Sequence, residues 1–251
     1  MPEKVNGLSK QRQKYIQSLH NKKYRRQYGV FLVEGQKSIL ELLDSDFEIE
    51  ELFLTSLGDS QVNFQGKVTL CSDAEVKKVS FLQTNNFGIA IVRMKDSQSI
   101  EIAQDEWVLA LDDIRDPGNL GTIIRTADWY GIKTIICSHD TVDCYNPKVI
   151  SSTMGSFARV NLVYAELKDY LSKVGKPVYG AVLNGENIHS QSFQVPGVLI
   201  IGSESHGISP EIETILDHRL TIPNFGNAES LNAGIATAIL LDNIKRGVSR
   251  A

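Results

Sequence analysis

The chain has 251 residues, of which 42% are hydrophobic and 22% are charged, with 19 glycines. This composition is typical of a globular protein and excludes global disorder and collagen-like scaffolds. No apolar run reaches the roughly 18 residues of a membrane span, and the N-terminus lacks the apolar segment of a signal peptide, so we expect a cytoplasmic protein.

Cysteine and histidine usage points to no metal centre. Cys71, Cys137 and Cys144 are scattered outside any CxxC pattern, which is typical of incidental thiols in a reducing compartment. The five histidines show no metal-ligand spacing. We therefore expect neither disulfides nor a bound metal.

The net charge of −4 conceals a basic N-terminal region. Residues 1–30 carry eight basic residues and one acidic residue, including Lys22, Lys23, Arg25 and Arg26. Three tyrosines lie among them, and aromatic rings can stack on bases where cations hold phosphates. The region is a candidate RNA-binding surface, although charge alone equally fits a solvated helix face.

Strands and helices alternate in the first part of the chain, which predicts a small α/β domain. Helices are expected over 8–28, 36–45 and 73–82. Strands are expected over 29–35, 50–56, 68–72 and 88–94. The polar segment that follows interrupts this rhythm, so we predict a domain over 1–95 and a linker over 96–106.

The same alternation continues at larger scale over 107–251, predicting a second α/β domain. The strand expected over 107–114 is apolar at nearly every position, as in a parallel sheet covered on both faces. Further strands are expected over 132–138, 161–165, 177–183, 197–207 and 219–224. Helices are expected over 121–131, 145–160, 167–175, 209–217 and 230–247.

Residues 113–125, "DIRDPGNLGTIIR", form a glycine-containing turn between a strand and a helix. The spacing fits neither a Walker loop nor a dinucleotide-binding fingerprint. The turn would instead place Asn119 at the carboxyl edge of the sheet, where open α/β sheets bind ligands, with Arg125 close behind on the helix. A helix cap at Asn119 and a surface arginine are the simpler alternative.

Two later loops are also candidates for ligand binding. Residues 200–209, "IIGSESHGIS", present Glu204 between glycines that allow a ligand to approach the backbone, although an ordinary exposed turn would look similar. Residues 222–236, "IPNFGNAESLNAGIA", open a helix rich in small residues, with Ser230 as a candidate N-cap. Gly234 would allow close contact with a subunit or a crossing segment of chain.

Together these loops resemble the three sequence motifs of the SpoU (TrmH-type) RNA 2′-O-ribose methyltransferases of the SPOUT superfamily. The matching stretches are "DPGNLGTIIRTADWYGI", "LIIGSESHGIS" and "IPNFGNAESLNAGIATAIL". "KYRRQYGVFLVEGQKSILELL" further resembles the ribosomal-protein-like α/β domain that binds the RNA substrate in many members. The resemblance covers nearly the whole chain, and three motifs in this order are highly specific.

The resemblance implies a methyltransferase domain over 107–251 with a parallel sheet flanked by helices and a deep trefoil knot. It also implies S-adenosylmethionine as cofactor and a homodimer with the active site at the subunit interface. The cofactor-binding positions that match the motifs are Gly202, Glu204, Ile222 and Leu231. The active-site positions that match are Asn119, Arg125, Glu204, Ser230 and Asn232.

The family assigns the deprotonation of the ribose hydroxyl to the arginine at position 125. A free guanidinium stays protonated above a pH of about 12, so a role in holding phosphate or orienting the substrate is physically easier. The chain departs from the motifs at Asn224, where methionine is usual, and at Ala233-Gly234, where Val-Ser is commoner. These changes predict a slightly more polar cofactor pocket and a less certain dimer contact.

The leading hypothesis is an S-adenosylmethionine-dependent RNA 2′-O-methyltransferase that acts on ribosomal RNA. Transfer RNA is an alternative substrate. Two other hypotheses are a non-catalytic RNA-binding protein that retains the fold and a SPOUT enzyme that methylates a base.

Overall fold

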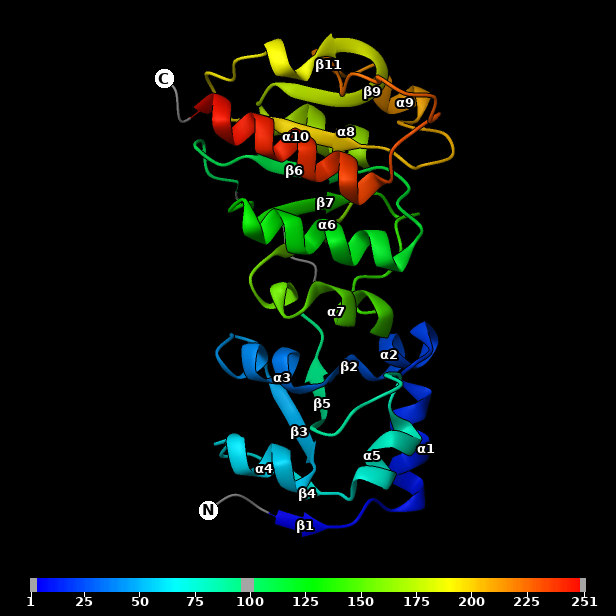
Figure 1. The fold of residues 1–251 in the computed structure, drawn as a ribbon. Helices are drawn as coiled ribbons and strands as arrows, with labels where there is room; N and C mark the ends of the chain where they lie inside the picture. The colour runs from blue at the N-terminus through cyan, green and yellow to red at the C-terminus, as the bar shows by residue number, and fades with distance from the viewer. Residues whose placement is uncertain (1–3, 96–101, 249–251) are drawn as a thin grey trace. The chain divides into compact units, whose positions relative to one another are not determined.

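The computed structural model describes residues 4–95 and 102–248. Most of the predicted linker, residues 96–101, lies outside the described residues. The contacts divide the chain into two compact units, the first comprising residues 1–96 and 143–158 and the second comprising residues 97–142 and 159–251. Figure 1 shows the elements of both units.

The first unit contains a five-stranded mixed sheet in the order β1-β4-β3-β5-β2. Its strands are β1 (Lys4–Asn6), β2 (Val30–Glu34), β3 (Ile49–Leu54), β4 (Val68–Leu70) and β5 (Gly88–Arg93). Its helices are α1 (Lys10–Ser18), α2 (Lys22–Tyr28), α3 (Gln36–Leu43), α4 (Ser56–Gln61), α5 (Asp73–Val79), α7 (Pro147–Thr153) and the short 3₁₀ helix η1 (Ser156–Ala158).

Side-chain alternation along β2 builds two cores, one on each face of this sheet. Phe31 and Val33 join a buried cluster with residues of α3 and with Ile150 of α7. Val30 and Leu32 join the cluster on the other face, with residues of α1 and α5. Since both faces are covered, every residue of β2 is buried.

The sequence predicted one helix over 8–28, and this prediction is wrong at its middle. The structure has two helices, because the chain turns at Leu19–Asn21 and a new helix begins. The side chain of Asn21 accepts a hydrogen bond from Lys23 N at 2.9 Å, which caps the start of α2.

The second unit contains a six-stranded, entirely parallel sheet in the order β11-β9-β10-β6-β7-β8. Its strands are β6 (Val108–Leu111), β7 (Thr134–Cys137), β8 (Asn161–Tyr164), β9 (Val178–Asn187), β10 (Val198–Ile201) and β11 (His218–Thr221). Its helices are α6 (Pro117–Trp129), α8 (Leu167–Val174), η2 (Ile188–Ser190), α9 (Pro210–Glu213) and α10 (Ala233–Val248).

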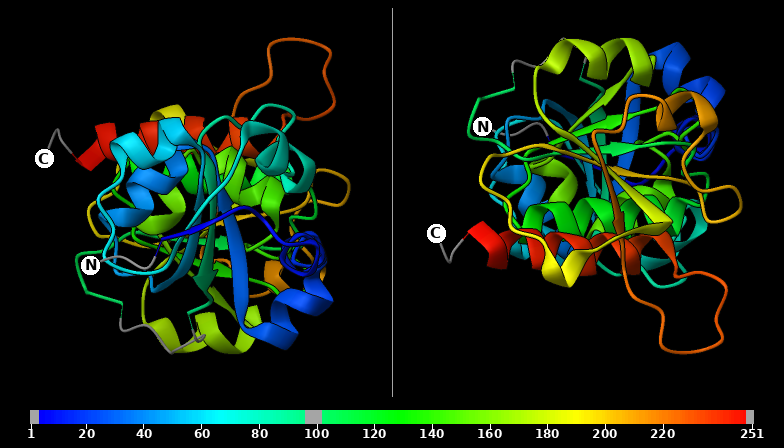
Figure 2. Two further views of the ribbon diagram at one scale, coloured as in Figure 1. Left: turned by 90° about the horizontal axis from the view of Figure 1, so that it is seen from below. Right: turned by 90° about the horizontal axis from the view of Figure 1, so that it is seen from above.

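Helices cover both faces of the parallel sheet. Val108 and Ala110 of β6 pack with residues of α8 and α9 in one buried cluster. On the other face α6 and α10 lie side by side (Figures 1 and 2). β6 is therefore buried on both faces, as its unbroken apolar sequence predicted.

The order of the strands fixes where the loops meet. β7 lies beside β6 on one side, whereas β10, which is late in the chain, lies on its other side. This change of direction is a topological switch point, and ligands of open α/β sheets bind outside the carboxyl ends of the strands at such points. The loops after β6 and β10 both begin there.

Candidate active site

The first predicted loop joins β6 to α6, and its cap differs from the one that the sequence suggested. The carboxylate of Asp116 accepts a hydrogen bond from Asn119 N at 2.9 Å, and Pro117 occupies the first turn. Asp116 is thus the N-cap of α6. The side chain of Asn119 is left free for other contacts.

The third loop ends at a second cap that differs from prediction. Ser230 was the candidate N-cap, but α10 begins only at Ala233. Instead, Oδ1 of Asn232 accepts hydrogen bonds from Gly234 N at 3.0 Å and Ile235 N at 3.3 Å. Because the side-chain oxygen caps the helix, the N–H donors of Asn232 Nδ2 point away from α10 and can bind other side chains.

Asn119, Glu204 and Asn232 come from three separate loops and form one hydrogen-bonded cluster. Oε1 of Glu204 accepts hydrogen bonds from Asn119 Nδ2 at 3.0 Å and from Asn232 Nδ2 at 2.7 Å. Nδ2 of Asn232 also donates to Oδ1 of Asn119 at 2.8 Å. The structure therefore brings together three of the five residues predicted at the active site.

The position of Glu204 suits a negative charge. Its Oε1 also accepts a hydrogen bond from the backbone N–H of Ala233, the first residue of α10, at 3.2 Å. The N-terminus of a helix carries a partial positive charge, and hydrogen bonds from N–H groups stabilise a carboxylate. Glu204 is nevertheless exposed to solvent, so its second carboxylate oxygen can meet a ligand.

The loop that carries Glu204 is a tight turn built on two glycines. Ser203 and Gly207 exchange backbone hydrogen bonds of 3.0 Å and 2.9 Å. A Cβ atom on Gly202 would lie 2.1 Å from the carbonyl carbon of Gly207, which no side chain can tolerate. Gly207 itself has a φ of 69°, in the left-handed region that favours glycine.

A buried aspartate that the sequence analysis missed holds the far end of this loop. Asp112 follows β6, is 7% exposed, and its Oδ2 accepts a hydrogen bond from Ser209 N at 2.7 Å. The residue thus joins the loop after β10 to the end of β6. An acidic residue directly after a buried apolar strand was the available signal.

A pocket of about 690 Å³ opens beside Glu204. It is lined by the middle of β9, the loop after β10, the loop after β11 and the first turns of α10. All four residues predicted to bind the cofactor line it, namely Gly202, Glu204, Ile222 and Leu231. Ser230 lines it as well. Its volume lies within the range of about 300–1,000 Å³ found for small-molecule sites.

Asn224, the departure from the third motif, also lines this pocket, but its side chain is engaged within the loop. Its Nδ2 donates to Ala228 O at 2.8 Å, and its Oδ1 accepts from Gly226 N at 2.8 Å. Asn224 therefore shapes the loop after β11, which extends away from the second unit as the orange segment in Figure 2.

Arg125 is not part of the hydrogen-bonded cluster. Its side chain is exposed on α6 and makes no hydrogen bond or ion pair with the part of the chain that the structure describes. Trp129 lies one turn further along the same helix and is 84% exposed. Residues four apart share a helix face, so Arg125 and Trp129 are presented to solvent together.

Gly234 was expected to permit a close contact, and the structure shows one within the chain. A Cβ atom at this position would lie 2.9 Å from Cγ2 of Thr122 on α6. The missing side chain thus lets the start of α10 approach the helix that carries Arg125.

The basic cluster of the first unit divides into exposed and buried members. Lys22, Lys23 and Arg26 are exposed, whereas Arg25 is 1% exposed. The guanidinium of Arg25 pairs with the carboxylate of Asp143 at 2.6 Å. Its burial removes Arg25 from the predicted RNA-binding surface and gives it a structural role.

The sequence predicted neither a metal site nor a membrane-spanning segment, and the structure bears on both only for the residues that it describes. Over 4–95 and 102–248, no three His, Cys, Asp or Glu side chains are grouped so that they could hold a metal ion. Over the same residues, no helix combines the length and the apolar character needed to cross a membrane.

Comparison with known proteins identifies the family. The SpoU rRNA Methylase family matches residues 106–242. The chain belongs to this family. A second match, to the MRM3-like substrate binding domain, covers residues 10–90. The fold is accordingly that of a SPOUT methyltransferase with an additional N-terminal domain, and the expected trefoil knot is consistent with that class.

Full-length relatives support the same assignment. A Bacillus subtilis protein, 23S rRNA (guanosine(2553)-2′-O)-methyltransferase RlmP, is 30% identical over 96% of this chain and 98% of its own length. A putative RNA methyltransferase of the TrmH family from Porphyromonas gingivalis is 34% identical, with a TM-score of 0.85 over 96% of this chain and 99% of that one. An AdoMet-bound rRNA methyltransferase from Sinorhizobium meliloti is 29% identical, with a TM-score of 0.89 over 97% of each chain.

Proposed function

We propose that this SpoU-family protein is an RNA 2′-O-ribose methyltransferase that uses S-adenosylmethionine and acts on ribosomal RNA. One observation carries the proposal. Asn119, Glu204 and Asn232, each from a different family motif, are hydrogen-bonded to one another beside the pocket. Full-length relatives named as rRNA methyltransferases support the reaction and the substrate class.

The pocket suits S-adenosylmethionine, which carries an apolar-faced adenine and a positively charged sulfonium. Ile222, Leu231 and Leu240 offer apolar contacts, while Gly202 allows close approach of the backbone. Glu204 and Glu229 line the same pocket with carboxylates that suit a cationic ligand. When bound there, S-adenosylmethionine supplies an electrophilic methyl group.

The remaining predicted residues position the ribose. Arg125 offers a planar set of donors that matches phosphate and ribose oxygens, and we assign it to orient the RNA rather than to accept the proton. Ser230, exposed at the pocket, orients the hydroxyl or the arginine. The hydrogen bonds of Asn119 and Asn232 fix the orientation of the Glu204 carboxylate and of each other's amide group.

A homodimer would complete the site around Arg125. Trp129, 84% exposed, and Ile235, 52% exposed, place apolar side chains on α6 and α10, the helices beside the catalytic cluster. Apolar side chains exposed on neighbouring helices are typical of an interface. We propose that a second copy covers them and that the active site is shared between subunits.

The two halves of the chain take different roles in this proposal. Residues 107–251 form the methyltransferase domain, except that 143–158 pack with the first unit. Residues 1–95 bind the RNA substrate, and residues 96–106 connect the two parts. Lys22, Lys23 and Arg26 supply exposed positive charge to the substrate-binding part. The reaction takes place in the cytoplasm, where ribosomal RNA is available.

Methyl transfer from labelled S-adenosylmethionine tests the proposal. The acceptors are ribosomal RNA, transfer RNA and immature ribosomal particles from cells that lack the protein, each digested to nucleosides and identified by mass. A 2′-O-methylnucleoside in ribosomal RNA or its particles is expected. A product confined to transfer RNA would redirect the substrate, and a methylated base would overturn the reaction. RNA binding with no transfer to any acceptor would indicate a non-catalytic protein.

A further inference from the structure

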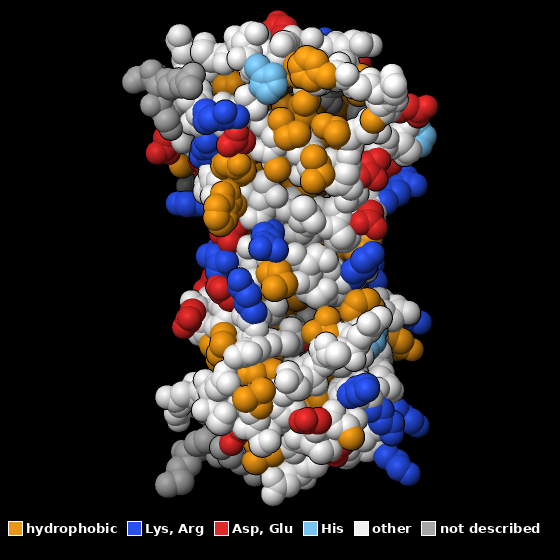
Figure 3. Space-filling view, in the orientation of Figure 1, with side chains coloured by type: hydrophobic (Ala, Val, Ile, Leu, Met, Phe, Trp, Pro, Cys, Tyr) orange, Lys and Arg blue, Asp and Glu red, His pale blue; other side chains and the backbone are white. Residues whose placement is uncertain are grey.

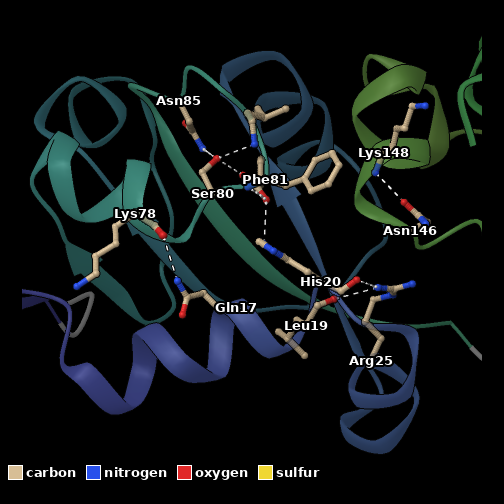
Figure 4. Close-up of polar contacts among 12 residues, drawn as sticks. Gln17, Leu19, His20, Arg25, Lys78, Ser80, Phe81, Asn85, Asn146 and Lys148 are labelled. Atoms are coloured by element: carbon tan, nitrogen blue, oxygen red, sulfur yellow. Dashed lines mark hydrogen bonds and ion pairs between the residues drawn. The ribbon is translucent and has the colours of Figure 1, made fainter.

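Helix α2 is held by a polar side chain instead of an apolar face. Arg25 is its single buried residue. The guanidinium donates hydrogen bonds to the carbonyl oxygens of Leu19 at 3.0 Å and His20 at 2.9 Å (Figure 4), and it pairs with Asp143. This one residue anchors the helix, and the other side chains of α2 are exposed to solvent.

Two of those exposed side chains are tyrosines that present aromatic faces. Tyr24 and Tyr28 lie one helical turn apart, with ring centroids 6.4 Å apart and planes only 15° from parallel. They are 36% and 43% exposed. The ring of Tyr28 is supported from the side by Tyr15, at 5.1 Å and 68°. The two rings are therefore nearly parallel, and each is partly exposed to solvent.

Positive charge surrounds these rings. Lys22, Lys23 and Arg26 are exposed on the same short helix, which contains no acidic residue. Nζ of Lys23 lies 5.9 Å from the centroid of the Tyr24 ring. Figure 3 shows basic side chains along the edge of the first unit where Figure 1 draws α1 and α2. Aromatic faces among cations match a polyanion whose bases can stack.

We propose that Tyr24 and Tyr28 form a stacking site for unpaired nucleobases, with Lys22, Lys23 and Arg26 holding the adjacent phosphates. The inference rests on the proposed function, which makes RNA the substrate, and specifies that the RNA bound by α2 is single-stranded. In a duplex each base is covered by its neighbours, whereas unpaired bases can be placed against aromatic side chains.

The test compares two double variants of the full chain. Y24F/Y28F keeps both aromatic faces, and Y24L/Y28L removes them while keeping apolar side chains. Fluorescence anisotropy measures binding to labelled oligoadenylate and to an adenylate–uridylate duplex of equal length. We expect Y24L/Y28L to bind oligoadenylate at least about fivefold more weakly than Y24F/Y28F, because each stacked base contributes on that order. Duplex binding should be the same for both variants.

A second variant guards against a folding defect, since Tyr28 also contacts Tyr15. Tyr24→Leu alone should show the same selective loss, with an unchanged thermal unfolding curve. Equal affinity of Y24F/Y28F and Y24L/Y28L for oligoadenylate would overturn the proposal. The exposed tyrosines would then be candidates for contact with a protein instead. An equal loss on duplex and single strand would also overturn it.

The stacking site and the methyltransferase assignment can fail independently. A wild-type protein that transfers no methyl group, but whose leucine pair loses affinity only for single strands, would refute the proposed function and retain the stacking site. Normal methyl transfer together with unaltered RNA binding by Y24L/Y28L would refute the stacking site and retain the proposed function.

Discussion

Nδ2 of Asn232 lies 2.7 Å from Oε1 of Glu204, although 28 positions separate the two residues in the sequence. The other end of the same amide caps α10 through Gly234 N. One side chain thereby fixes the start of a helix and the orientation of a carboxylate beside the pocket. The geometry explains why an asparagine, with a donor and an acceptor on one planar group, suits this position.

Asn232→Asp separates these two tasks. The aspartate can still cap α10, but it loses both N–H donors and brings a second negative charge against Glu204. We expect methyl transfer to fall at least about tenfold, because hydrogen bonds to charged groups contribute about 1.5–3 kcal/mol each. The measurement is the transfer rate at saturating RNA, with thermal unfolding as control. An unchanged rate would show that the cluster has no part in the reaction.

Arg125→Ala should abolish turnover without loss of cofactor affinity, because Arg125 does not line the pocket. Arg125→Lys keeps the charge but loses the planar set of donors. If Arg125 orients the RNA, the lysine variant should show a reduced rate with an unshifted pH profile. A profile displaced toward the lower pKa of lysine would indicate that the side chain accepts the proton. Cofactor affinity by calorimetry and the pH–rate profile are the two measurements.

Gly202→Ala should prevent the loop after β10 from closing, since the new Cβ would lie 2.1 Å from backbone atoms of Gly207. We expect loss of S-adenosylmethionine binding and a drop in stability of about 2 kcal/mol or more. Gly226→Ala is the matched control, because a Cβ there meets only Asn224 Oδ1 at 3.9 Å. Similar behaviour of the two variants would contradict the close-approach argument. Calorimetric titration with the cofactor decides the matter.

Asp112→Ala should weaken cofactor binding from a distance. The substitution leaves Ser209 N without its acceptor at the end of the loop that carries Glu204. Loss of a buried acceptor costs about 1–3 kcal/mol, so we expect about a 5- to 150-fold weaker affinity. Asp112→Asn retains an oxygen acceptor and should restore most of it. Failure of asparagine to rescue binding would mean that the charge of Asp112, rather than its hydrogen bond, is required.

Glu75 gives a pH dependence that can be measured in the first unit. Its carboxylate accepts hydrogen bonds from Leu8 N and Ser72 N, and these hold the pKa of Glu75 below its usual value. A depressed folded-state pKa means that the stabilisation is present above the unfolded-state pKa of about 4.3 and is lost as the pH falls through the folded-state pKa.

Glu75→Gln should therefore lower the free energy of unfolding at pH 7 by at most about 1 kcal/mol, since the site is partly exposed. The difference between the variant and the wild type should shrink below a pH of about 4. Chemical denaturation at pH 7 and at lower pH values measures it. A constant difference across this range would show that the charge of Glu75 contributes nothing.

Much of the strand pattern could be predicted from the sequence, because buried strands are marked by unbroken apolar runs. Val30–Glu34 and Val108–Leu111 lie within the predicted ranges for this reason. The break at Leu19–Asn21 was missed, although Asn21 is a local N-cap signal. The burial of Arg25 could not be predicted, since an arginine on a short polar helix is normally solvated. Its burial depends on Asp143, a partner 118 positions away.

The site residues were found through the family motifs, but their contacts were not. Asn119 and Ser230 both looked like helix caps, whereas Asp116 and Asn232 hold those positions. Local sequence leaves a cap ambiguous by a few residues, because several neighbouring side chains can accept the same backbone hydrogen bond. Only the folded chain shows which amide is left to bind Glu204.

Residues 143–158 have a consequence for how the protein can be divided. Ile150 and Phe157 from this segment belong to the same buried cluster as Phe31 and Val33. A fragment that ends at residue 95 would lack part of its own interior, and the complementary fragment would carry an apolar segment with nothing to bury it. A substrate-binding module exchanged between relatives would therefore have to include residues 143–158 as well as the N-terminal residues. For the same reason, we expect these two segments to change together in evolution.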